Sequence, residues 1–163
     1  MKVFGVVGWK NSGKTGLMER LVTEFTGRGI SISTIKHAHH AFDVDQPGKD
    51  SFRHRVAGAR EVVLASAYRF AIMHELRDAD EPSLDDLLSK MAPVDLVLIE
   101  GYKTEHHAKI EANRAATGKD LLAPNDAKIL AVASDRQPRI DRPVFDLDDT
   151  VGIADFIAVQ VGL

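Results

Sequence analysis

The chain of 163 residues contains no cysteine. This absence excludes a disulfide framework, a thiolate metal site and a cysteine nucleophile. The chain also lacks a basic surplus, because 24 Asp and Glu residues outnumber its 21 Lys and Arg residues. Proteins that bind nucleic acid nonspecifically usually carry an excess of positive charge. We therefore expect no nucleic-acid partner.

Long hydrophobic runs are absent as well. The longest apolar stretches have the length of one strand, far below the ~20 residues that cross a bilayer, and the first residues lack the pattern of a signal peptide. The composition, 44% hydrophobic and 28% charged, is ordinary for a folded domain. We expect one domain over residues 1–163, cytoplasmic and without membrane contact.

The apolar runs that are present are short and continuous. Residues 3–7, 96–99 and 129–133 form such runs, and residues 31–35 form a further β-branched run. Continuous runs are typical of parallel strands that are covered on both faces in α/β proteins. The remaining pair, residues 62–65 and 70–73, is separated by too few residues for a crossover helix and predicts an antiparallel hairpin.

Helices are predicted between these strands. Residues 17–25 carry an apolar stripe at helical spacing. Ser83, with Asp86 three residues later, predicts the start of a helix over residues 84–91, and Thr150 is the expected cap of a last helix. Two polar stretches, residues 37–50 and 102–125, are longer than ordinary connections, and we expect them to be loops that cover a site.

Residues 8–15 read GWKNSGKT and match the P-loop pattern G-x-x-x-x-G-K-[ST] at every fixed position. Glycines let successive backbone N–H groups turn toward phosphate oxygens, and the start of the following helix adds partial positive charge. Lys14 is expected to reach the β- and γ-phosphates, and the Thr15 hydroxyl to bind magnesium. A glycine-rich turn without a ligand would need neither residue. The predicted phosphate-binding residues are Gly8, Asn11, Ser12, Gly13, Lys14 and Thr15.

The fold class predicted is therefore α/β, a P-loop NTPase with a mostly parallel sheet flanked by helices and an antiparallel hairpin.

Glu100 ends the apolar run 96–99. Nucleotides bind outside the carboxyl ends of the strands in such sheets, and a carboxylate there holds Mg²⁺ directly or through water. The alternative is an acidic strand end that simply meets solvent. Asp95 begins the same strand, so we expect it at the opposite edge and exclude it from the site.

The segment after residues 31–35 is rich in polar side chains. Regions in this position commonly sense the γ-phosphate and magnesium in P-loop proteins. Lys36 and His37 are candidates for phosphate contact, and Asp45 for a magnesium-bound water or the attacking water. Asp50 is alternatively the N-cap of a short helix over residues 51–57. For each residue a structural role is also open.

A histidine cluster allows a second interpretation. His37, His39 and His40, with His106 and His107 further on, could ligate zinc or nickel. No cysteine assists them, and adjacent histidines in a loop usually point in different directions. Polar contact with a substrate or a partner chain is the preferred interpretation.

Asp135 follows the run 129–133, again at the carboxyl edge. A carboxylate there could accept the N1 and N2 hydrogens of guanine, a pair that adenine lacks. Only the Asp of an Asn-Lys-x-Asp motif is present, so selectivity for guanine stays open. No catalytic arginine or base stands out among Arg53, Arg55, Arg60 and Arg69, which predicts slow intrinsic hydrolysis that awaits a partner.

Several motifs together carry a family resemblance. In order and spacing they resemble the MobB family of molybdopterin-guanine dinucleotide biosynthesis adapters, from Met1 to about Asp135. The motifs are GWKNSGKT at 8–15, TIKHAHH at 34–40, DQPGKDS at 45–51, AGA at 57–59 and LIEGYK at 98–103.

The resemblance implies a homodimeric, weakly hydrolysing GTP-binding protein. It would assist the guanylyltransferase MobA, which joins GMP to the molybdenum cofactor. By position, Thr15 and Glu100 would serve the magnesium, and residues 37–51 would face nucleotide or molybdopterin.

Two alternatives remain. A small-molecule phosphotransferase would need an arginine-bearing lid, and residues 104–118 contain only Arg114. A GTP-dependent metallochaperone would normally show a cysteine-containing metal site, which this chain lacks.

Overall fold

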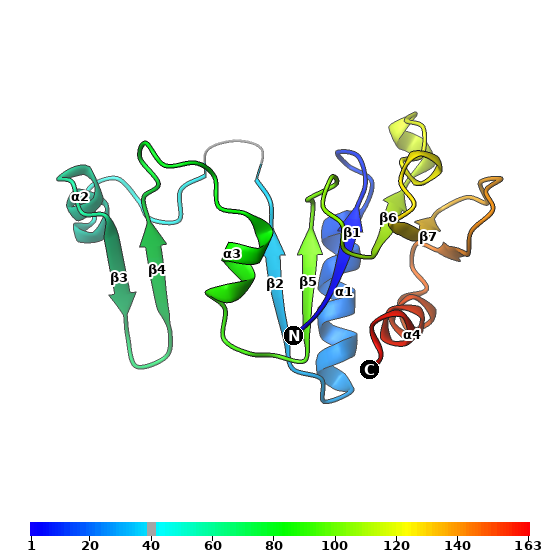
Figure 1. Cartoon of the computed structure of the whole chain (residues 1–163), viewed down its shortest axis with the longest axis horizontal. Helices are drawn as coiled ribbons and strands as arrows, with labels where there is room; N and C mark the ends of the chain where they lie inside the picture. Colours follow the sequence, from blue (N-terminus) through cyan, green and yellow to red (C-terminus); the bar gives the residue numbers. More distant parts are fainter. Residues whose placement is uncertain (39–41) are drawn as a thin grey trace. The chain divides into compact units, whose positions relative to one another are not determined.

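The computed structural model describes residues 1–38 and 42–163 (Figure 1). The chain forms two compact units. We call Met1–Ala38 with Ala92–Leu163 the sheet unit, and His39–Met91 the hairpin unit. The expectation of a single domain over residues 1–163 stays a prediction.

The sheet unit is built on six strands in the order β2-β5-β1-β6-β7-β8, and every neighbouring pair is parallel. Their carboxyl ends therefore meet at one edge (Figure 1). The strands are β1 (Lys2–Val7), β2 (Ile32–Lys36), β5 (Leu96–Glu100), β6 (Lys109–Asn113), β7 (Ile129–Ser134) and β8 (Val144–Asp146). The predicted parallel sheet is confirmed.

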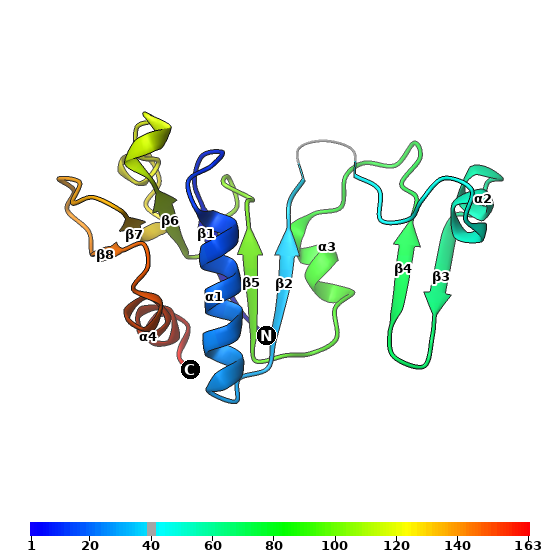
Figure 2. The ribbon, with the colours of Figure 1, turned by 180° about the vertical axis from the view of Figure 1, so that it is seen from behind.

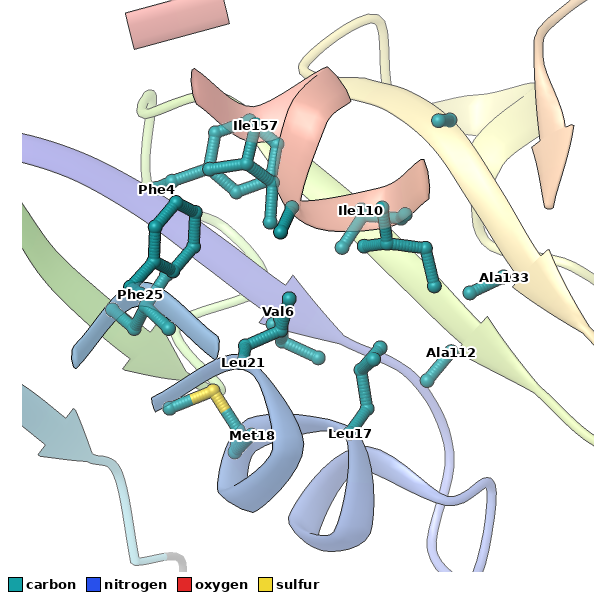
Figure 3. Packing of buried hydrophobic residues seen from close by; sticks show 14 of the residues in the cluster. Phe4, Val6, Leu17, Met18, Leu21, Phe25, Ile110, Ala112, Ala133 and Ile157 are labelled. Atoms are coloured by element: carbon teal, nitrogen blue, oxygen red, sulfur yellow. The ribbon is translucent and has the colours of Figure 1, made fainter. Parts of the chain in front are cut away.

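Two helices, α1 (Lys14–Gly27) and α4 (Thr150–Val161), lie on the same face of this sheet (Figure 2). The apolar stripe of α1 packs there on Phe4 and Val6 of β1, and Ile157 of α4 completes the cluster (Figure 3). Leu17, Leu21 and Phe25 of this stripe are fully buried. Each such side chain contributes about 1.5–3 kcal/mol on burial, so this packing fixes where α1 begins.

The polar stretch 102–125, expected to be a loop, contains β6. Three polar residues of this strand, Lys109, Glu111 and Asn113, alternate with two apolar ones, and all five are buried. The prediction was wrong because the buried polar face removes the continuous apolar run by which the other central strands are recognised. Two short 3₁₀ turns follow, η1 (Ala115–Thr117) and η2 (Ala123–Asn125).

The N-cap of the last helix lies one residue before the predicted position. Asp149, not Thr150, is the N-cap of α4, because its carboxylate accepts a hydrogen bond from the Gly152 N–H at 3.0 Å. Within the described residues no helix is long and apolar enough to cross a membrane.

The hairpin unit contains α2 (Asp50–Val56), the antiparallel strands β3 (Glu61–Ala65) and β4 (Phe70–His74), and α3 (Leu84–Ser89). The predicted hairpin is confirmed, and Ser83 with Asp86 forms the expected capping box. Asp50 is the first residue of α2 rather than its cap, which is Lys49.

One face of the hairpin is apolar and exposed. Val62 and Met73 are paired and buried, whereas the next pair, Val63 and Ile72, is more than half exposed. Phe70 shares the face of Ile72, two residues away along the strand, and is 71% exposed. An exposed apolar patch of this kind is typical of an interaction surface.

Candidate functional site

The loop between β1 and α1 requires its glycines. Gly8 has a φ of +148°, and a Cβ there would lie 2.3 Å from the carbonyl oxygen of Ala112. Gly13, with a φ of +95°, is the last residue before α1, and Asn11 also has a positive φ, +64°. The backbone thus adopts the left-handed conformations with which a P-loop turns its N–H groups inward.

Lys14, the first residue of α1, folds back over this loop. Its Nζ donates a hydrogen bond to the carbonyl oxygen of Trp9 at 2.7 Å. Burial lowers the pKa of Lys14; Glu100 opposes this shift, while the positive charges of Lys103 and Lys36 add to it. An anion in the loop would offset the lowering, so the position favours a phosphate ligand.

Thr15 and Glu100, the two residues predicted for magnesium in this unit, lie together. The Thr15 hydroxyl donates to Glu100 Oε1 at 3.5 Å. Hydroxyl and carboxylate oxygens are suitable ligands for Mg²⁺, so the pair fits the ion. Asp95, at the other end of β5, binds the backbone and hydroxyl of Ser31 instead, as its exclusion from the site predicts.

Lys36 and His37 arrive at the same edge from β2. Lys36 lies opposite Glu100 in the sheet register, and the His37 N–H donates to the Glu100 carbonyl oxygen at 2.9 Å. The His37 ring stacks on Tyr102, with centroids 4.5 Å apart. Gly101 and Tyr102 both have positive φ, so the turn after Glu100 is tightly constrained.

A pocket of about 440 Å³ opens over the loop and the start of α1. It is lined by Asn11, Ser12, Gly13, Lys14, Thr15, Gly16 and Arg114. Five of these are predicted phosphate-binding residues, whereas Arg114 was missed as a site residue. Because Arg114 directly follows β6, recognising that strand would have placed it at the carboxyl edge.

Trp9, inside the loop, connects it to two other segments. The indole Nε1 donates to the carbonyl oxygen of Asp120 at 2.8 Å. The ammonium of Lys103 lies 4.4 Å from the centre of the ring, a cation–π contact. The only tryptophan of the chain is therefore positioned to report on the pocket.

Asp135 directly follows β7, at the expected edge. Its Oδ1 accepts a hydrogen bond from the backbone N–H of Ala115 at 2.8 Å. Ala115 is the neighbour of Arg114, so the carboxylate supports the segment that lines the pocket. Its predicted contact with guanine stays a prediction.

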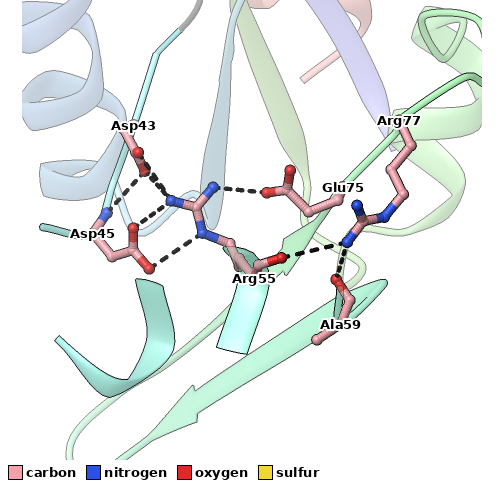
Figure 4. A network of polar contacts seen from close by, with 6 residues as sticks. All are labelled: Asp43, Asp45, Arg55, Ala59, Glu75 and Arg77. Carbon is pink, nitrogen blue, oxygen red and sulfur yellow. Dashed lines mark hydrogen bonds and ion pairs between the residues drawn. The ribbon is translucent and has the colours of Figure 1, made fainter. Parts of the chain in front are cut away.

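Asp45 lies in the hairpin unit and has a protein partner (Figure 4). Its two carboxylate oxygens accept from Arg55 at 2.5 and 3.2 Å, and its side chain is only 6% exposed. Arg55 also pairs with Asp43 and Glu75, both at 2.7 Å. This network gives Asp45 a structural role, while its predicted role at magnesium stays a prediction.

The histidines do not form a metal site in the described part of the chain, where no group of three or more His, Asp or Glu residues is placed to hold an ion. His39 and His40 lie outside the described residues. His106 is exposed. Burial lowers the pKa of His107 to about 4, assisted by the positive charge of Lys109 and opposed by Asp126.

The geometry agrees with comparisons to known proteins. The family model described as MobB, molybdopterin guanine dinucleotide synthesis protein B, matches residues 3–135. A molybdopterin-guanine dinucleotide biosynthesis adapter protein of Escherichia coli is 42% identical over 154 residues, covering 91% of this chain and 87% of its own. The protein of that name from Haemophilus influenzae is also 42% identical, covering 95% and 86%. The crystal structure of a MobB homologue from Bacillus stearothermophilus matches with a TM-score of 0.74 at 30% identity over 99% of both chains. The chain therefore belongs to the MobB family.

Proposed function

We propose that this protein is a GTP-binding adapter in the synthesis of molybdopterin guanine dinucleotide. It binds GTP with Mg²⁺ in the pocket over the P-loop and assists the guanylyltransferase MobA, acting as a homodimer in the cytoplasm. The observation that carries the proposal is the position of Lys14, which is partly buried over a glycine-shaped loop and, within residues 1–38 and 42–163, donates its hydrogen bond to a backbone carbonyl alone. That bond is readily exchanged for stronger ones to phosphate oxygens.

The magnesium proposal is supported by the oxygens of Thr15 and Glu100. An ion held there would neutralise charge on the β- and γ-phosphates. Lys14 would contact the same phosphates, and the backbone of Gly13 would approach them closely, since it has no side chain.

The guanine proposal is supported by the location of Asp135. Its Oδ1 is occupied by the Ala115 N–H. We propose that the second oxygen accepts hydrogens from the guanine base. Lys36 and His37 would add contacts to phosphate or to the pterin.

The adapter role is supported by the names of the two relatives that are 42% identical. Slow hydrolysis agrees with the ion pairs of Arg55. This guanidinium is bound to three carboxylates, so Arg55 is unsuited to contact phosphate. Homodimer formation is supported by the exposed apolar face of the hairpin, Val63, Phe70 and Ile72.

Calorimetric titration with GTP, and with ATP for comparison, tests the nucleotide proposal. We expect GTP to bind in the presence of Mg²⁺ more tightly than ATP. Lys14→Ala should weaken GTP binding about 10- to 100-fold, the usual effect of losing hydrogen bonds to a charged group. Lys128→Ala, which removes a positive charge just before β7 at the opposite edge, is the matched control and should bind normally.

Unchanged GTP affinity in Lys14→Ala would contradict the phosphate assignment. Equal affinity for GTP and ATP would remove the guanine claim alone. The partner proposal is tested separately by sedimentation of the protein with purified guanylyltransferase. We expect a complex, and independent sedimentation of the two proteins would refute that part.

A further inference from the structure

We infer that Arg114 binds the diphosphate portion of the nucleotide, from the side of the P-loop opposite Glu100. This inference rests on the proposed nucleotide site and adds to it a residue outside every motif of the sequence.

The sheet order places Arg114. Strands β5 and β6 flank β1, one on each side. Glu100 ends β5 and contacts Thr15, which defines the magnesium side of the loop. Arg114 directly follows β6, so it approaches from the other side, between the loop and Asp135.

The guanidinium lies close to the loop itself. The Nε of Arg114 is 3.1 Å from the point where a Cβ on Gly13 would stand. Gly13 is the residue at which the loop turns into α1. Arg114 lines the same pocket as Lys14.

The charge of Arg114 has no compensating partner in the described part of the chain. Among the residues that the structure describes, none pairs with its guanidinium, and the side chain is exposed. Arg55 and Arg28, by contrast, are each held by two or more carboxylates. Arg114 lines the pocket together with Lys14 and the start of α1, where positive potential already accumulates. Phosphate oxygens are the ligand class that would reverse this repulsion.

The backbone of Arg114 is nevertheless well held. Its carbonyl oxygen accepts from the N–H and the hydroxyl of Thr117, at 3.0 and 2.9 Å. The next N–H, that of Ala115, donates to Asp135. The residue is therefore presented to the pocket by a fixed turn, which reduces the entropy lost when a ligand binds.

The position of Arg114 beside the loop favours contact with the diphosphate rather than with the γ-phosphate. Magnesium bridges the β- and γ-phosphates in P-loop proteins, and Glu100, which would hold the ion together with Thr15, ends the strand on the far side of β1. Arg114 is therefore a binding residue shared by the diphosphate and the triphosphate. A residue that acted on the γ-phosphate during hydrolysis would instead interact with the triphosphate and not with the diphosphate.

Titration of Arg114→Ala with GDP and GTP tests this distinction. We expect both affinities to fall by a similar factor, about 10-fold or more. Arg114→Lys should recover part of the loss, because it keeps the charge but not the planar fork. Lys128→Ala serves as the control with the same change in net charge. Since Arg114 has no partner among the described side chains, the variant should fold normally.

Two results would overturn the inference. One is unchanged affinity for both nucleotides. The other is unchanged affinity with a slower single-turnover hydrolysis of bound GTP, which would give Arg114 a role in the transition state. If the wild-type protein binds GDP and ADP equally, the guanine proposal fails, and the loss on Arg114→Ala is then measured with ADP. If the wild type binds no nucleotide at all, the proposed function and this inference fail together.

Discussion

Charged side chains in the sheet unit fall into two kinds. Lys109 is fully buried and donates to the Glu105 carbonyl oxygen and to Asp126. Glu111, also fully buried, accepts the N–H groups of Leu122 and Ala123 at 2.8–2.9 Å. These charges have permanent protein partners and hold the surrounding loops. Lys14 and Arg114 instead line an open pocket, and the difference separates structural charges from ligand-binding ones.

The lowered pKa of His107 predicts that the folded protein loses stability in acid. The pKa of His107 is about 4 in the folded protein, whereas that of an unperturbed histidine is 6.5. Between these values the unfolded chain therefore binds more protons than the folded protein. The free energy of unfolding should therefore fall as the pH is lowered from 6.5 toward 4, and the full contribution is present above 6.5. In the described part of the chain neither ring nitrogen has a hydrogen-bond partner, so protonation gains no compensating contact.

Urea unfolding at pH 7.5 and at pH 5.5 measures this effect. His107→Leu should lose less stability between the two pH values than the wild type does. His106→Gln, a change at the exposed neighbour, should keep the wild-type difference. An identical difference in the wild type and His107→Leu would show that other groups carry the acid sensitivity.

Much of each element could be predicted from the sequence where pattern and burial agree. Continuous apolar runs identified β1, β5 and β7, and the P-loop motif located the start of α1. β6 could not be recognised, because the partners that satisfy its polar side chains, such as the Leu122 and Ala123 N–H groups for Glu111, are not revealed by the sequence. Arg114 was missed for that reason. The pairing of Asp45 with Arg55 was likewise hidden, because their contact depends on how the hairpin unit folds.

Gly8→Ala tests the shape of the loop. The new Cβ would collide with the Ala112 carbonyl oxygen and with Ser12 Oγ, at 2.3 and 2.5 Å, in a backbone conformation that favours glycine. We expect a loss of about 1–3 kcal/mol of stability and a loss of nucleotide affinity. Urea unfolding and calorimetric titration measure the two effects.

Gly27→Ala is the control for that substitution. Gly27 ends α1, and apart from its chain neighbours and the backbone of its own helix, no heavy atom of the described residues lies within 4 Å of the position of its Cβ. Because alanine favours the helix, this variant should gain about 0.5–1 kcal/mol and bind nucleotide normally. A Gly8→Ala protein with normal stability and affinity would mean that the loop does not need its left-handed turn.

The assembled molecule is predicted to be a dimer through its hairpin. Val63, Phe70 and Ile72 share one exposed face of β3 and β4, whereas Val62 and Met73 on the other face are buried. Ile72→Glu should place a charge in that contact and shift the sedimenting species from dimer to monomer. Val159→Glu, at a 76% exposed position of α4, should leave the dimer intact. A dimer that is unaffected by Ile72→Glu would require another interface.

The order of the strands also determines when the phosphate-binding loop can fold during synthesis. β1 lies between β5 and β6, and its Val6 is in register with Glu100 of β5 and Ile110 of β6. During synthesis on the ribosome, the strand that leads into the P-loop must wait until both partners have emerged. Pairing between such distant segments is slow, because a long chain must be closed first. The phosphate-binding loop is thus translated before β5 and β6 and is completed only after both strands have emerged.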